Sequence, residues 1–125
     1  MKGKPTKKKT EASVKFEDLF EAVEDLKLSK KEFSDVHGGF RLHDKDFVVA
    51  DLRPAKYGVR LYVGRDGLTH PIRIQSKKDL EKATKILRAL MYGRTTKNGK
   101  TTYKNGDITT ESKKEFIEYL IKKEF

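Results

Sequence analysis

The residue types best suited to metal or acid–base chemistry gather between positions 35 and 46. Two of the three histidines stand there with three aspartates: His37, His43, Asp35, Asp44 and Asp46. Carboxylate and imidazole groups of this kind could bind a divalent cation. Aspartate is also a common turn residue, and neither cysteine nor a paired histidine spacing accompanies it. We therefore predict ordinary turn residues here, with no metal site and no cofactor.

A pattern similar to a nuclease core occurs at the start of a helix-period segment. Asp79 is followed by Glu81 and Lys82, the residue types of an Asp…Glu-x-Lys site. A nuclease core places them on adjacent strands, whereas a helix start does not. The glycine-flanked turn at 64–67 lacks the length and the lysine of a phosphate loop. We therefore predict no catalytic residue and no enzymatic activity.

Basic side chains interleaved with an aromatic ring carry a different chemistry. In the strand predicted at 58–63, Arg60 and Tyr62 alternate with apolar residues, and Arg73 does so in the next strand. Arg53 lies nearby in sequence. Arginines beside an aromatic ring suit a phosphate backbone and a stacked base. The alternative is the ordinary polar side of a half-buried antiparallel sheet.

Two Asn-Gly pairs, at 98–99 and 105–106, favour the tight turns that join hairpin strands. The segment 95–107 between and around them is predicted to form a protruding two-stranded ribbon with basic side chains. Together with the sheet face, it would form one basic footprint. The predicted nucleic-acid-binding residues are Arg53, Arg60, Tyr62, Arg73, Arg94, Lys97, Lys100, Tyr103 and Lys104.

Three amphipathic segments are expected to position these residues. Apolar residues at helical spacing predict helices over 16–26, 76–91 and 116–121. Ser76 is the expected N-cap of the middle helix, and Thr109 or Thr110 that of the last. Their apolar sides should share one core with the strands around Leu61 and Ile72.

Several local signals predict the remaining elements. Ser29 to Glu32 has capping-box spacing, which predicts a short helix whose Phe33 and Val36 pack on the core. Residues 40–42 should form a hairpin with the strand that starts at 47. Pro54 should end that strand, because proline removes a sheet donor. A further strand is expected over 68–74.

These elements predict an α+β domain. It should contain a small antiparallel sheet of three to four strands packed with amphipathic helices, a protruding basic β-ribbon and a C-terminal helix. Residues 1–12 are predicted to be a disordered basic tail. Residues 13–125 should form a single domain, with the ribbon at 94–107.

The distribution of charge indicates the class of partner. The chain carries a net charge of +10, and segments 47–75, 76–93 and 94–110 contribute +3 each. Segment 15–27 is acidic, at −3. A polarised basic protein favours a polyanion, with nucleic acid ahead of a membrane. The absence of cysteine fits a cytoplasmic location, and no apolar run is long enough to span a bilayer.

The order of features from 40 to 90 resembles an uncharacterised family of small domains, labelled predicted transport proteins and found fused to restriction-type proteins. The matching stretches are Phe47-Val48-Val49, Val59 to Val63, and Ile72 to Leu80, with a similar opening at Phe16 to Phe20. The resemblance implies a sheet-plus-helix domain in a setting near DNA or phage defence. It implies no catalytic residues.

Two functions from different classes follow. The first is a nonenzymatic nucleic-acid-binding protein, with DNA ahead of RNA, that contacts the phosphate backbone through the sheet face and the ribbon. The second is a small protein-binding effector or inhibitor that acts on an acidic protein partner. In one version of this hypothesis the protein is phage-encoded. Oligomeric state is left open.

Overall fold

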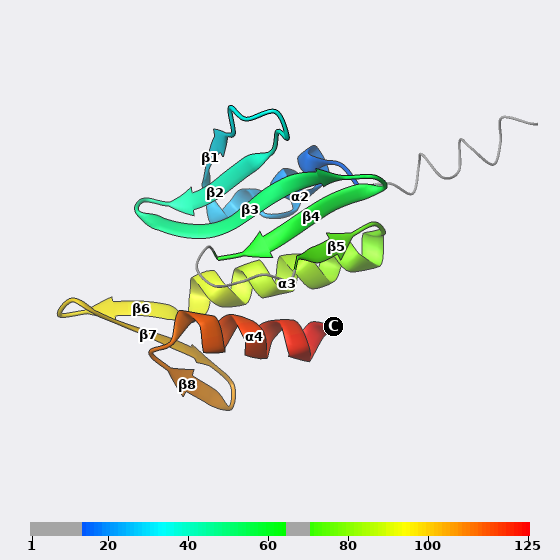
Figure 1. The fold of residues 1–125 in the computed structure, drawn as a ribbon. Coiled ribbons are helices and arrows are strands. Elements are labelled where there is room, and N and C mark those ends of the chain that lie inside the picture. The colour runs from blue at the N-terminus through cyan, green and yellow to red at the C-terminus, as the bar shows by residue number, and fades with distance from the viewer. Residues whose placement is uncertain (1–13, 65–70) are drawn as a thin grey trace, which may run out of the picture.

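The computed structural model describes residues 14–64 and 71–125, and within them three α-helices and two antiparallel sheets confirm the α+β class (Figure 1). The first sheet contains β1 (Ser29–Glu32), β2 (Phe40–Asp44), β3 (Phe47–Ala55), β4 (Gly58–Val63) and β5 (Ile72–Ile74), in that order. The second contains β6 (Arg94–Lys97), β7 (Lys100–Asn105) and β8 (Ile108–Thr110). The helices are α2 (Phe16–Ala22), the short 3-10 helix η1 (Glu24–Leu26), α3 (Lys77–Gly93) and α4 (Lys113–Glu124).

The predicted basic tail lies outside the described residues, as does the segment 65–70, which includes most of the predicted turn at 64–67 and the start of the predicted strand over 68–74. Of that strand, β5 forms the described part, and it stands at the edge of the first sheet. None of the helices in residues 14–64 and 71–125 is long and apolar enough to cross a membrane.

The core joins the first sheet with all three α-helices, because Phe116 and Leu120 of α4 belong to the same buried cluster as the sheet residues. The buried positions of β4 are Val59, Leu61 and Val63, and they alternate with half-buried residues. Leu19 of α2 and Leu87 of α3 are fully buried in the same cluster, so both helices cover the same face of the first sheet. The predicted shared core is therefore confirmed. Ser76 caps α3 as expected, because its Oγ accepts a hydrogen bond from the Asp79 N–H.

The predicted short helix after Ser29 is wrong, because this segment forms the edge strand β1 and pairs with β2 in antiparallel register. Lys27, with φ of 53°, turns the chain into the strand. Val36 does not pack on the core either: it is 95% exposed in the loop after β1. The first sheet consequently has five strands instead of the expected three or four.

Pro54 was expected to end its strand, but β3 continues to Ala55. Pro54 is paired with Val59 of β4. On the other side, β2 pairs with β3 only as far as Leu52. The missing proline donor therefore costs no hydrogen bond on that side of the strand.

The expected two-stranded ribbon is a three-stranded sheet. Asn98 and Gly99 form the predicted turn between β6 and β7, whereas the turn between β7 and β8 is formed by Gly106 and Asp107, because Asn105 still pairs with Ile108. Gly93, at the end of α3, lies so close to β7 that an added Cβ would stand 2.4 Å from the Lys104 carbonyl oxygen. The N-cap of α4 is Ser112, whose Oγ accepts from Glu115 N–H. Thr110, one of the two expected caps, belongs to β8, and its hydroxyl accepts from Ser112 N–H.

Candidate nucleic-acid interface

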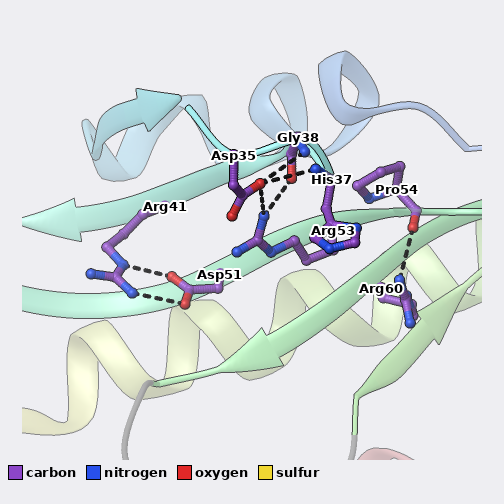
Figure 2. A network of polar contacts seen from close by, with 8 residues as sticks. All are labelled: Asp35, His37, Gly38, Arg41, Asp51, Arg53, Pro54 and Arg60. Atoms are coloured by element: carbon purple, nitrogen blue, oxygen red, sulfur yellow. Dashed lines mark hydrogen bonds and ion pairs between the residues drawn. The ribbon is translucent and has the colours of Figure 1, made fainter. Parts of the chain in front are cut away.

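The side of the first sheet opposite α2 and α3 is called the outer face. Side chains alternate along a strand, so residues between buried positions point toward this face. Figure 2 shows several of them, with α3 behind the sheet. The polar residues on the outer face are Arg41 of β2, Asp51 and Arg53 of β3, Arg60 and Tyr62 of β4, and Arg73 of β5.

Three arginines stand next to one another across the outer face. Arg53 is paired with Arg60 across β3 and β4, and Arg60 is paired with Arg73 across β4 and β5. We call these three residues the arginine row. Like charges that face each other directly across strands destabilise a sheet. The row therefore weakens the free protein and concentrates positive charge on one line.

Arg53 is the arginine at the β3 end of the row, and it is held by the loop after β1. Its Nη1 donates to Asp35 Oδ1 at 2.9 Å and to the Gly38 carbonyl at 2.7 Å (Figure 2). Its guanidinium also lies 4.0 Å from the ring centre of Phe33. The hydrogen bond from Arg53 holds the pKa of the Asp35 carboxyl below its ordinary value. Arg53 thus fixes the loop, and its charge is partly neutralised.

Arg60 and Arg73 have no such acidic partner. Arg60 donates from Nη2 to the Pro54 carbonyl at 3.3 Å, and its buried Nε has no hydrogen-bond partner. Arg73 is exposed. Among the described residues, no carboxylate forms an ion pair with either side chain. The uncompensated positive charge of the row therefore lies on these two arginines.

Arg41 and Asp51, which the sequence did not single out, form an ion pair beside the row. Arg41 donates from Nε to Oδ1 at 2.8 Å and from Nη2 to Oδ2 at 3.0 Å (Figure 2). The hydrogen bond to Asp51 raises the pKa of Arg41. Their opposite charges face each other in adjacent strands. The sequence contained both charges, but only knowledge of the strand register could have paired them.

Tyr62 is the aromatic residue of this face. It is half-buried and lies across from Asp51 of β3. Two residues away on the same strand and the same face stands Arg60. Within the described part of the chain, the Tyr62 side chain makes no hydrogen bond or ring contact. The structure thus brings together four of the predicted site residues: Arg53, Arg60, Tyr62 and Arg73.

Arg94 lies elsewhere and joins the two sheets. It donates from Nη2 to Asp44 Oδ2 at 2.8 Å, and its guanidinium lies 3.9 Å from the ring centre of Phe47. The register of β2 against β3 shifts between Leu42 and His43, and beyond the shift Asp44 pairs with Phe47. Asp44 follows the buried Leu42 by two residues, so it lies on the same side of β2, the side that faces the core. Arg94 is therefore a structural residue and not part of the outer face.

The remaining predicted residues belong to β6 and β7, which Figure 1 shows beyond α3 from the first sheet. Lys97 and Lys104 are exposed, whereas Lys100 forms an exposed ion pair with Glu111 at 2.9 Å. Tyr103 was expected to offer a stacking surface, but it is buried, with its ring 5.3 Å from that of Phe116. The structure does not bring these residues onto the face that carries the arginine row.

The helices α2 and α3, on the side of the first sheet away from the arginine row, carry opposite charges. The acidic α2 and η1 lie against α3, where Arg88 of α3 donates to Asp25 Oδ1 at 2.7 Å and to the Ala22 carbonyl. The acidic element therefore lies opposite the arginine row, as an oriented polyanion-binding protein would require. The basic side of α3 also lies on this side of the first sheet, and the ribbon residues belong to a second sheet. The sheet face and the ribbon therefore do not form the one basic footprint expected from the sequence.

Two of the three turn aspartates considered for cation binding have other partners. Asp35 binds Arg53, and Asp44 binds Arg94. Across residues 14–64 and 71–125, no three side chains of His, Cys, Asp or Glu gather in a way that could hold a metal ion. His43 contacts the Lys45 carbonyl through Nδ1 at 3.1 Å.

Comparison with known proteins finds no matching family model, no matching curated protein and no matching solved structure. The resemblance to the uncharacterised small-domain family therefore stays a prediction.

Proposed function

We propose that this protein is a nonenzymatic nucleic-acid-binding protein that uses the outer face of its first sheet. The observation that supports this most is the arginine row. Arg60 and Arg73 face each other across adjacent strands without an acidic partner in the described residues. Such an arrangement costs stability in the free protein. A bound phosphate backbone would offset that cost, since its charge would fall between the two guanidinium groups.

The partner proposed is DNA ahead of RNA, in the cytoplasm. Lys97 and Lys104 are exposed on the second sheet and could add phosphate contacts of their own. Such contacts would add affinity but no base readout. Arg94 and Tyr103 are omitted from the proposed interface, because the first joins the two sheets and the second is buried.

The direct test is to measure binding of labelled DNA by fluorescence anisotropy over a range of salt concentrations. The double variant Arg60→Ala with Arg73→Ala should bind more weakly. The slope of log affinity against log salt should flatten by about 1–2, since each lost phosphate contact removes roughly 0.7–0.9. A matched control is Lys78→Ala with Lys85→Ala, which removes the same charge from exposed positions of α3.

Equal weakening by the two double variants would mean that net charge, not the outer face, determines binding. A folded arginine double variant with unchanged affinity would exclude the outer face as the interface. A pulldown from lysate with and without nuclease would then test the second function, binding to an acidic protein partner. A partner that survives nuclease treatment and is lost with the arginine double variant would favour it.

A further inference from the structure

We infer that the outer face takes a single strand of nucleic acid, with one base stacked on Tyr62 and its phosphate held by Arg60 and Arg73. This inference rests on the proposed function and specifies the substrate class. It follows from the shape of the face, the position of one aromatic ring and the partners of the surrounding charges.

The shape of the outer face does not suit the grooves of a duplex. Five strands spaced about 4.8 Å apart span roughly 19 Å. The major groove of B-DNA is about 12 Å wide and admits a helix or a two-stranded ribbon. The first sheet is too wide to enter, so a duplex could touch the row only along its outer phosphates. A single strand can instead lie flat on the sheet and turn its bases toward it.

The spacing of Tyr62 and Arg60 fits one nucleotide. They are two residues apart on β4 and point the same way, which separates their Cα atoms by about 6.6 Å. Arg73 stands across from Arg60 on β5. A phosphate between these two arginines would leave its base within reach of the tyrosine ring. Stacking on such a ring is tolerant of base identity, because every base has an aromatic face.

Among the described residues, no unpaired carboxylate faces the half-buried Tyr62 ring, Arg60 or Arg73. Asp51 faces Tyr62 across the strands, but both of its carboxylate oxygens are engaged by Arg41. At the other end, Arg53 is held by Asp35 and the Gly38 carbonyl. The uncompensated part of the row therefore lies between β4 and the edge strand β5, directly beside Tyr62.

The experiment compares a single-stranded oligonucleotide with the duplex of the same sequence. It uses the full chain and three substitutions: Tyr62→Leu, Tyr62→Phe and, as a control, Tyr92→Leu. Leucine keeps apolar bulk without a ring, and phenylalanine keeps the ring. Tyr92 is 69% exposed on α3, on the other side of the sheet. Circular dichroism melts confirm that each variant is folded.

The wild-type protein should bind the single strand more tightly than the duplex. Tyr62→Leu should weaken single-strand binding by about 5- to 150-fold, which corresponds to the roughly 1–3 kcal/mol of one stacked base. Tyr62→Phe and Tyr92→Leu should bind like the wild type. A second readout is a 2-aminopurine base in the oligonucleotide, whose fluorescence should be quenched by the wild type and by Tyr62→Phe but not by Tyr62→Leu.

Two results would overturn the inference and leave the proposed function standing. One is a duplex bound as tightly as the single strand, with binding that still depends on Arg60 and Arg73; the proposed function would then survive without it. The other is an unquenched 2-aminopurine in every position of an oligonucleotide that the wild type binds. A wild-type protein that binds neither the single strand nor the duplex would overturn both the inference and the proposed function.

Discussion

Replacing Arg60 by glutamine should make the free protein more stable and its nucleic-acid binding weaker. Arg60 lies directly across from Arg73 and from Arg53. Glutamine keeps part of the apolar stem and an N–H donor, but it removes the charge. The substitution therefore tests whether the row is a site of repulsion in the absence of a ligand.

The magnitude follows from the register. Residues directly opposite each other have Cβ atoms about 5 Å apart. Two unit charges at that distance would repel by about 0.8 kcal/mol in water, which is an upper bound because the guanidinium groups at the ends of the side chains can lie further apart than the Cβ atoms. Arg53 is already paired with Asp35, so mainly the repulsion with Arg73 is relieved. The substitution also removes the hydrogen bond from Arg60 to the Pro54 carbonyl, which is long at 3.3 Å, and this loss offsets part of the gain in stability. We expect the free energy of unfolding to rise by about 0.2–0.8 kcal/mol.

The assay is urea unfolding at low salt and at about 1 M salt, where the screening length falls to roughly 3 Å and the gain should disappear. The matched control is Arg41→Gln on the same face. It breaks the ion pair with Asp51, whose two side chains are 27% and 20% exposed. The free energy of unfolding of this variant should be lower by about 1 kcal/mol, because the partly exposed Asp51 carboxylate is left unpaired.

The same substitution should thus change stability in opposite directions at two positions of one sheet face. If Arg60→Gln destabilises the protein at low salt as much as Arg41→Gln does, then Arg60 and Arg73 do not repel each other measurably. The row would then be an ordinary solvated surface, and the main support for the proposed function would be lost.

Three other substitutions and one pH profile test the fold. Arg94→Ala should lower the free energy of unfolding by about 1–3 kcal/mol in urea titrations, since it removes a partly buried ion pair and a ring contact between the sheets. Leu87→Ala should cost about 2–5 kcal/mol by the same measurement, because the side chain is fully buried. Gly93→Ala should lower the melting temperature, since its Cβ would meet a β7 carbonyl at 2.4 Å. In the folded state the pKa of Asp35 lies below its ordinary value of 3.8. Asp35 therefore contributes to the free energy of unfolding above that pH, and this contribution is lost as the pH falls. The stability difference between the wild type and Asp35→Asn should therefore be present near neutral pH and shrink in acid.

The features that the sequence predicted well depend on neighbouring residues. The alternation along β4 and the Ser76 cap of α3 are set within one strand or one helical turn. The Asn-Gly signals act within two residues, and the structure forms a hairpin at or beside each. Local chemistry was therefore enough to predict these elements and the α+β class.

The features that the sequence missed depend on distant pairing. Ser29 to Glu32 has capping-box spacing, but its pairing with β2 decides that it is a strand. The partner of Arg94 is 50 residues away at Asp44, in a strand of the other sheet. Tyr103 reads as an exposed aromatic residue of a polar ribbon until α4 packs against it through Phe116. Such contacts cannot be derived from local periodicity.

The candidate site shows the same division. Alternation placed Arg60, Tyr62 and Arg73 on one face from the sequence alone. The register was needed to show that the arginines face each other, and the loop was needed to show that Arg53 is partly neutralised. Of the nine predicted contact residues, the structure therefore groups Arg60, Tyr62 and Arg73 on β4 and β5, with Arg53 beside them.

On the outer face, as far as the described residues go, Arg60 and Arg73 are the arginines without an acidic partner, and their number limits the electrostatic part of binding. Arg60 and Arg73 can account for one shared phosphate or at most two separate ones, which corresponds to a salt slope of roughly −0.7 to −1.4 on a single strand. That is a modest electrostatic contribution, so tight binding by this face would have to come from stacking on Tyr62. A much steeper slope would require cations from other parts of the chain, such as Lys97 and Lys104 of the second sheet. The salt slope thus separates two modes of binding. In one, a flat face holds one or two nucleotides through a ring and a pair of arginines. In the other, the charge of the whole protein holds a polyanion without orientation.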